Sequence, residues 1–127
     1  MGAVRAQLLL GEFNPAVFVA MRSVESRISR LARLEPTLHG TDVVTAAFGA
    51  DKPLRYPTDI SAEADGIYLL FRGAMLAFRN STGHRPEAFD DQVTASEVIV
   101  FANLLHRLLD LMAPDDEPPS RPPPVYG

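Results

Sequence analysis

The sequence has no cysteine and only one lysine, Lys52. Without cysteine, neither a disulfide nor a thiolate metal site can stabilise the fold. A cysteine-free chain whose start shows no signal-peptide pattern is typical of an intracellular protein, so we expect a cytoplasmic location. The apolar runs at residues 8–10 and 98–105 are too short or too polar to cross a bilayer, which predicts that the protein has no membrane partner.

Positive charge is also scarce, with 12 basic against 16 acidic residues and a net charge of −4. This balance argues against a broadly basic nucleic-acid binder. The basic residues are nearly all arginine, whose planar fork binds phosphate better than lysine does. A GC-rich coding genome would produce the same bias, so the arginines alone identify no site. Five of them crowd the first third of the chain: Arg5, Arg22, Arg27, Arg30 and Arg33.

The length of 127 residues suits one domain, and helical periodicity runs through it without a strand pattern. We expect an all-α bundle of four principal helices, preceded by a short apolar lead-in that makes a fifth helix plausible. The helical domain should span residues 1–112. Six prolines lie in residues 113–127, which predicts a disordered or extended tail.

Helix ends are predicted from capping residues. The first long helix, of about six turns, should begin with Asn14 as its N-cap and be closed by Pro36 and Gly40. A short helix at 42–48 should be capped by Thr41 or Asp42, and an irregular connection at 49–60 follows it.

The last helix, at 91–112, should be capped by Asp90 or Asp91, although the spacing of Thr94 and Glu97 also allows a later start. Its inward face is predicted to carry five apolar residues: Val98, Phe101, Leu105, Leu108 and Met112.

The helix around 62–80, with Ser61 as its cap, is apolar on almost every side. Its main stripe is Ala64, Ile67, Tyr68, Phe71, Met75 and Phe78. A second stripe is Gly66, Leu70, Gly73 and Ala77. A helix of this kind is buried on more than one side. It is either a central helix of the monomer core or a subunit interface, and both interpretations stay open.

The residues best suited to catalysis or phosphate binding lie at the end of that helix and just after it, at residues 78–85. Arg79 offers a fixed positive charge for a phosphate, and Asn80 offers a neutral donor and acceptor. His84 is of the residue type whose ordinary pKa suits proton transfer near neutrality. Such a set can activate a ribose 2′-hydroxyl without a metal. An ordinary helix end, with Asn80 as a C-cap and His84 as a loop histidine, is the competing interpretation.

Other site types find little support. His39 is expected in a loop and His106 on a polar helix face, both solvated or locally bonded. No two histidines have metal-ligand spacing, and the sequence has neither a glycine-rich phosphate loop nor a serine nucleophile elbow. We therefore expect no metal and no cofactor.

Several separate blocks resemble the Ymh family of bacterial and phage proteins. They include residues 11–14 (GEFN), 24–28 (VESRI), 40–44 (GTDVV), 71–74 (FRGA) and 78–85 (FRNSTGHR). The match runs from about residue 8 to 112, in the right order and with the right spacing. The Ymh family is placed in the HEPN superfamily.

The resemblance implies a HEPN-like helical bundle that forms a homodimer, here through the helix around 62–80. It also implies a metal-independent endoribonuclease whose two motif copies meet in one composite cleft. Carried over, Arg79 stabilises the transition state, His84 serves in acid–base catalysis and Asn80 positions the phosphate. Further RNA or phosphate contacts are expected from Arg72, Ser81, Thr82 and Arg85.

HEPN proteins serve as toxins and as phage-defence or abortive-infection effectors, so the resemblance also implies an RNA substrate and an antitoxin or defence-system partner protein. Two other functions remain open. One is a non-catalytic helical module that recruits a partner protein. The other is a sensor that binds a nucleotide or phosphate between Arg79 and His84.

Overall fold

The computed structural model describes residues 4–5, 11–49, 51–79 and 91–113. The regular structure in these ranges is helical, apart from one isolated bridge between Phe48 and Leu54. The elements are α2 (Phe13–Ala32), α3 (Thr41–Ala47), α4 (Ser61–Ala74), the π-helical turn η1 (Met75–Arg79) and α5 (Gln92–Met112). The all-α prediction is therefore confirmed. The predicted proline-rich tail beyond Ala113 lies outside the described residues.

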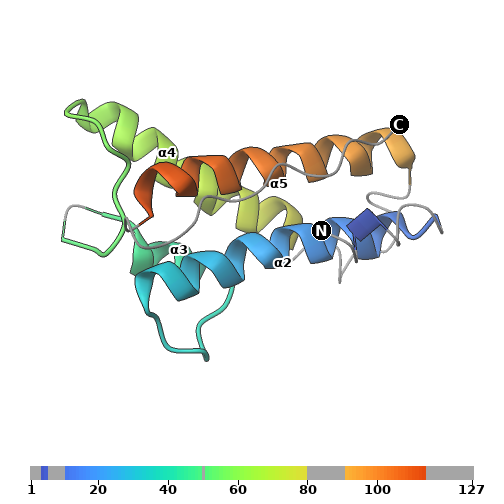
Figure 1. Ribbon diagram of the computed structural model, residues 1–127, viewed down its shortest axis with the longest axis horizontal. Helices are drawn as coiled ribbons and strands as arrows, with labels where there is room; N and C mark the ends of the chain where they lie inside the picture. Colours follow the sequence, from blue (N-terminus) through green and yellow to red (C-terminus); the bar gives the residue numbers. More distant parts are fainter. Residues whose placement is uncertain (1–3, 6–10, 50, 80–90, 114–127) are drawn as a thin grey trace.

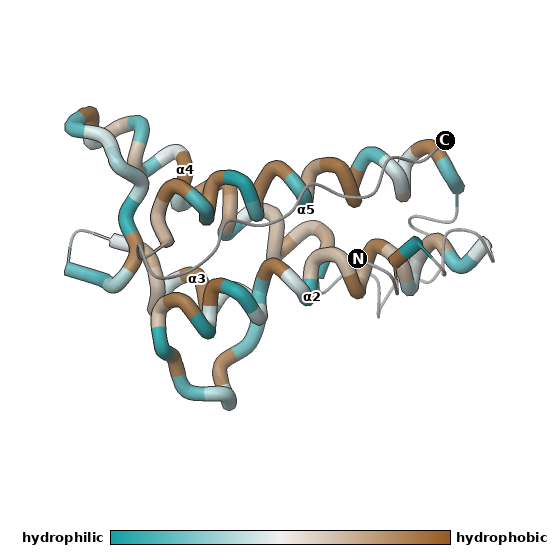
Figure 2. Tube along the Cα trace, in the orientation of Figure 1, coloured by the Kyte–Doolittle hydropathy of each residue, from teal (hydrophilic) through white to brown (hydrophobic). Residues whose placement is uncertain are grey.

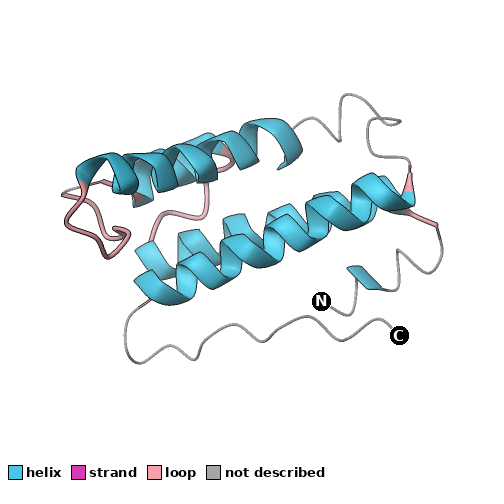
Figure 3. Cartoon of the chain, turned by 90° about the horizontal axis from the view of Figure 1, so that it is seen from above, coloured by secondary structure: helices cyan, strands magenta, loops and turns pink. Residues whose placement is uncertain are grey.

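The two long helices, α2 and α5, lie side by side and run in the same direction (Figure 1). Two contacts with the same offset show this direction, because Ser23 meets His106 and Arg27 meets Asp110 one helical turn further along. Helix α4 runs the opposite way in a second layer, where η1 packs on α2 and α4 on α3 (Figures 1 and 3). No helix of the described part is long and apolar enough to cross a membrane.

The core lies where these layers meet. Helix α2 contributes a fully buried stripe: Ala16, Val17, Ala20, Met21, Val24 and Ile28. Phe71 of α4 is also fully buried, and its ring stacks on Phe48 with centroids 4.9 Å apart. Leu54 is 2% exposed and anchors the connection between α3 and α4 to this core.

The ends of α2 differ from the prediction. The helix begins at Phe13, so Asn14 is inside it and is not the N-cap. Pro15 is tolerated there because amide groups of the first turn have no partner within the helix. The helix ends at Ala32, well before Pro36, because Arg33 takes a left-handed conformation with φ 54°. The amide of Leu34 then donates to the Ser29 carbonyl and closes the helix.

The predicted caps of α3 and α4 were also wrong. Thr41 and Asp42 lie inside α3, and Ser61 is the first residue of α4, with no side-chain cap bond at either helix. Gly40 precedes α3 at φ 61° and ψ −131°, a conformation open mainly to glycine.

The cap of α5 was predicted correctly. The Asp91 carboxylate accepts hydrogen bonds from the amides of Val93 and Thr94, at 3.0 and 3.1 Å. Hydrogen bonds with Thr94 hold the pKa of Asp91 below its ordinary value. The alternative start at Thr94 is wrong, because Thr94 lies within the first turn.

Helix α4 turns its main predicted stripe toward the core and exposes the second. Phe71 and Met75 are fully buried, whereas Gly66, Leu70 and Gly73 are exposed. Each glycine has space for a Cβ, since nothing would lie within 4 Å of it. No described backbone therefore approaches these glycines, and within the described residues α4 is covered on one side only. The use of this exposed face as a subunit contact stays a prediction.

Candidate functional site

The predicted motif begins at the last residue of η1. Arg79 is that residue, and Arg72 lies on the exposed side of α4, roughly 10 Å away along the helix at 1.5 Å per residue. The other predicted site residues lie outside the described residues: Asn80, Ser81, Thr82, His84 and Arg85. The structure thus fixes where the motif starts, and the meeting of Arg79 with His84 stays a prediction.

A carboxylate on the neighbouring helix holds Arg79. Its Nε donates to Oε2 of Glu25 on α2 at 2.6 Å, and the two side chains are only 19% and 7% exposed. The guanidinium carbon also lies 5.5 Å from the ring centroid of Phe18, within cation–π range. Charge-assisted bonds of this kind fix the plane of a guanidinium. Arg79 is thus oriented before any substrate binds.

The π-helical turn helps to aim this side chain. Five residues, Met75–Arg79, wind more widely than the α-helix before them. Met75 enters the core, Phe78 packs edge-on against Phe101 of α5 at 6.0 Å between centroids, and Arg79 reaches α2. Such turns are frequent at functional sites, because they change the direction of the residues that follow.

A hollow of about 380 Å³ opens next to the Glu25–Arg79 pair. Glu25 lines it together with His39, whose Nδ1 lies 3.4 Å from the second carboxylate oxygen of Glu25. Arg22 lines it too, and its guanidinium carbon lies 6.0 Å from the same Phe18 ring that Arg79 covers. The remaining lining residues are Ser26, Ser29, Arg30, Arg33, Leu34, Pro36 and Leu38.

The sequence showed that arginines crowd the first third of the chain, but it did not predict that some of them lie near Arg79. Their spacing was the available signal, because residues 22, 26, 29, 30 and 33 recur at helical intervals and share one face of α2. Glu25 lies off the apolar stripe of α2, yet it is 5% exposed. What places it inside is the approach of η1, which a pattern within α2 does not reveal.

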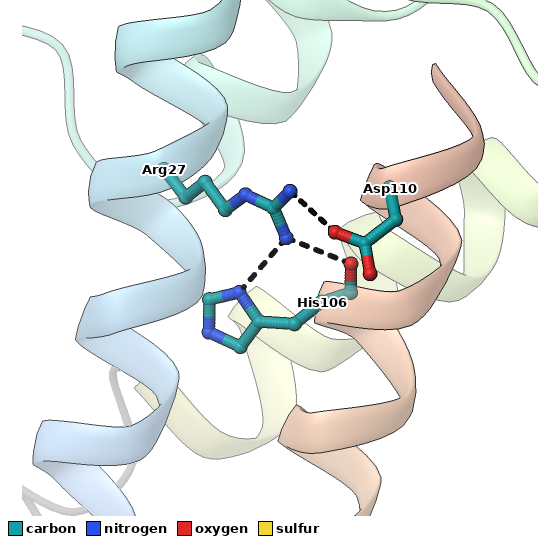
Figure 4. Close-up of polar contacts among 3 residues, drawn as sticks. All are labelled: Arg27, His106 and Asp110. Carbon is teal, nitrogen blue, oxygen red and sulfur yellow. Dashed lines mark hydrogen bonds and ion pairs between the residues drawn. The ribbon is translucent and has the colours of Figure 1, made fainter. Parts of the chain in front are cut away.

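A second polar cluster joins α2 to α5 (Figure 4). Arg27 is 4% exposed, and its Nη2 contacts the Asp110 carboxylate at 2.6 Å. Its Nη1 donates to the backbone carbonyl of His106 at 2.8 Å and lies 3.4 Å from that ring's Nδ1. His106 was predicted to be solvated or locally bonded on a polar helix face. It is half-buried and bonded to residues of α2, which covers this side of α5.

The partners of His106 indicate its protonation state. Arginine can only donate, so Nδ1 accepts from Arg27, and Nε2 then carries the proton toward the Ser23 hydroxyl 3.0 Å away. The hydroxyl in turn donates to the Ala20 carbonyl at 2.7 Å. Burial, aided by the charge of Arg27, lowers the pKa of His106 to about 4. The ring is neutral at physiological pH and serves to tie the two helices together.

The fold and the first of these clusters define a class: a small all-helical protein with an arginine-lined hollow beside a buried Glu–Arg pair. The chain belongs to the family described as "Protein of unknown function (Hypoth_ymh)", whose family model matches residues 1–109. The family predicted from the sequence blocks is therefore confirmed. No curated protein and no solved structure matches the chain significantly. In the described part of the chain, no group of three or more potential ligands could hold a metal ion.

Proposed function

We propose that this protein is a metal-independent endoribonuclease of the HEPN type, acting as a toxin or phage-defence effector. The observation that carries the proposal is the fixed position of Arg79. The Glu25 carboxylate holds it at the end of η1, immediately before the segment that contains Asn80 and His84. Membership of the Ymh family supports the proposal, because the resemblance to HEPN nucleases rests on this same segment.

In the proposed reaction, His84 removes the proton from a ribose 2′-hydroxyl. The 2′-oxygen then attacks the adjacent phosphorus, and the bond from phosphorus to the 5′-oxygen breaks. The leaving oxygen takes up a proton, so the products carry a 2′,3′-cyclic phosphate and a 5′-hydroxyl. Arg79 stabilises the charge that develops on the phosphorane oxygens, and Asn80 positions the phosphate.

The arginine-lined hollow extends the positive surface away from the reacting phosphate. Arg22, Arg30 and Arg33 line it, and Glu25 connects it with Arg79. Arginines at this spacing can bind phosphates of neighbouring nucleotides, which requires only a local positive field and is compatible with the net charge of −4. Arg72, Ser81, Thr82 and Arg85 are proposed to contact the same RNA.

The test compares purified wild-type protein with the His84→Ala variant on structured and unstructured RNA in excess EDTA. We expect the wild type to cleave and to leave cyclic phosphate ends. We expect His84→Ala to be slower by a factor of at least about 100, the usual contribution of general acid–base catalysis. Arg55→Ala is the matched control, because Arg55 is exposed in the connection between α3 and α4, and it should cleave normally.

Three outcomes would contradict the proposal: no cleavage by folded wild-type protein, equal cleavage by His84→Ala, or loss of wild-type cleavage in EDTA. DNA of the same sequence should stay intact, because it lacks the 2′-hydroxyl. Expression in cells tests the biological role. Wild type should arrest growth, and His84→Ala should not.

A further inference from the structure

Helix α5 has an outward face that no described residue covers. Four large apolar residues are strongly exposed there: Val93 at 66%, Val100 at 66%, Leu104 at 46% and Leu111 at 58%. Figure 2 shows hydrophobic residues along the whole of α5. Those on its inner side, including Leu105 and Leu109, belong to the core, and the four exposed ones lie on the outer side. An exposed apolar stripe of this length marks a contact surface.

The stripe has the spacing of a coiled-coil seam. With Glu97 and Arg107, which are also exposed, its members follow one another at alternating intervals of four and three residues. The six residues of this α5 face are Val93, Glu97, Val100, Leu104, Arg107 and Leu111.

We propose that the α5 face binds the α5 face of a second copy of this chain, with the two helices antiparallel. The members are placed symmetrically before and after position 102, so a two-fold axis that crosses the outward side of α5 at the level of Ala102 makes the face complementary to itself. The pairs across the interface are Val93 with Leu111, Glu97 with Arg107, and Val100 with Leu104. Each pair occurs twice, so two ion pairs lie among four apolar contacts.

The two charges select this arrangement over its competitors. A parallel pair would place Glu97 against Glu97 and Arg107 against Arg107, where like charges repel. An antiparallel pair shifted by one heptad would place Glu97 against Val100 or Arg107 against Leu104. Either shift leaves a charge without a partner in an apolar contact, which is costly. The antiparallel register centred on Ala102 satisfies both charges.

Measured along α5, the two candidate sites would lie near the level of the proposed axis. Phe78 packs on Phe101, next to Val100 and close to the proposed axis, and Arg79 follows Phe78. The proposal does not depend on RNA cleavage, because it rests on the exposure, spacing and charges of α5. Its competitor is the exposed face of α4, through which the family resemblance implied a homodimer and which includes Leu69 at 57% exposure.

Charge reversal tests the proposal in the full chain. In Arg107→Glu and in Glu97→Arg, like charges face each other twice across the interface. We expect each variant to be monomeric in sedimentation equilibrium, with a Kd raised at least about 100-fold, because such contacts cost several kcal/mol. The double variant Glu97→Arg/Arg107→Glu should dimerise again. An equimolar mixture of the two single variants should form a heterodimer.

Further variants check the helix direction and the competing surface. Because the chain has no cysteine, Val93→Cys mixed with Leu111→Cys should form an oxidised cross-linked dimer, and Val93→Cys alone should not. Leu69→Glu on α4 is the matched surface control and should remain dimeric. A monomeric wild type, a dimeric Arg107→Glu, a monomeric Leu69→Glu or a cross-link in Val93→Cys alone would each overturn the proposal. The positions are exposed, so circular dichroism should show every variant folded.

Discussion

At the scale of single residues, two buried ion pairs on α2 are the least expected feature. Glu25 and Arg27 are only two positions apart, yet they meet different neighbours: Glu25 contacts Arg79 of η1, and Arg27 contacts Asp110 of α5. Each charge is removed from water, and each is compensated by an opposite charge at 2.6 Å. These pairs therefore fix how α2 is oriented toward both of its partners.

The neutral His106 predicts how stability depends on pH. Its pKa is about 4 in the folded protein and ordinarily 6.5, so the unfolded chain takes up the proton first as the pH falls. Stability from this group is complete above pH 6.5 and is lost between pH 6.5 and 4. The slope should stay below about 1.4 kcal/mol per pH unit, since the ring is partly solvated.

Urea unfolding at pH 7 and pH 5 measures this effect. The midpoint of the wild type should fall toward pH 5, and that of His106→Gln should fall less, because glutamine does not titrate. Carboxylates titrating in both proteins cancel in the comparison. Equal pH dependence of the two proteins would show that His106 is not the group responsible.

At the scale of elements, the exposed side of α4 combines charged residues such as Glu63 and Arg72 with two glycines and two leucines, Gly66, Leu69, Leu70 and Gly73. Gly66→Ala and Gly73→Ala should each stabilise the protein by about 0.5–1 kcal/mol, since both glycines are helical with open space at the Cβ position. Thermal unfolding of the single variants measures this gain. A loss of stability instead, dependent on protein concentration, would reveal close packing of α4 against another chain.

The positions of the helices were predicted well, and their ends were predicted poorly. A long stretch with apolar residues at helical intervals is compatible only with an amphipathic helix, which is why α2, α4 and α5 were placed correctly. Asn14, Thr41 and Ser61 are all good capping residues, yet none of them caps its helix. The free-energy gain of one cap is small, so the packing of the core decides by a residue or two where a helix begins.

At the scale of the whole molecule, the two proposals predict a coupling between assembly and activity. If the cleft is composite, the monomeric variant Arg107→Glu should cleave RNA at least about tenfold more slowly than wild type. The double variant Glu97→Arg/Arg107→Glu should recover both the dimer and the cleavage. The RNA assay in EDTA, run at concentrations where wild type is dimeric, gives the comparison. A monomeric variant as active as wild type would place a complete site in each copy and leave the α5 interface unaffected.

The sequence by itself determined the helical class, the family, the apolar stripe of each long helix and the segment at 78–85, because all of these depend on residues close together in the chain. Only the tertiary structure decided that Glu25 holds Arg79, that His106 is covered by Arg27, and that α4 and α5 each keep an apolar face exposed. The physical reason is that periodicity defines the faces of one helix. Tertiary packing decides which face of a helix is buried and which charged residue contacts it, and it involves helices that are distant in sequence.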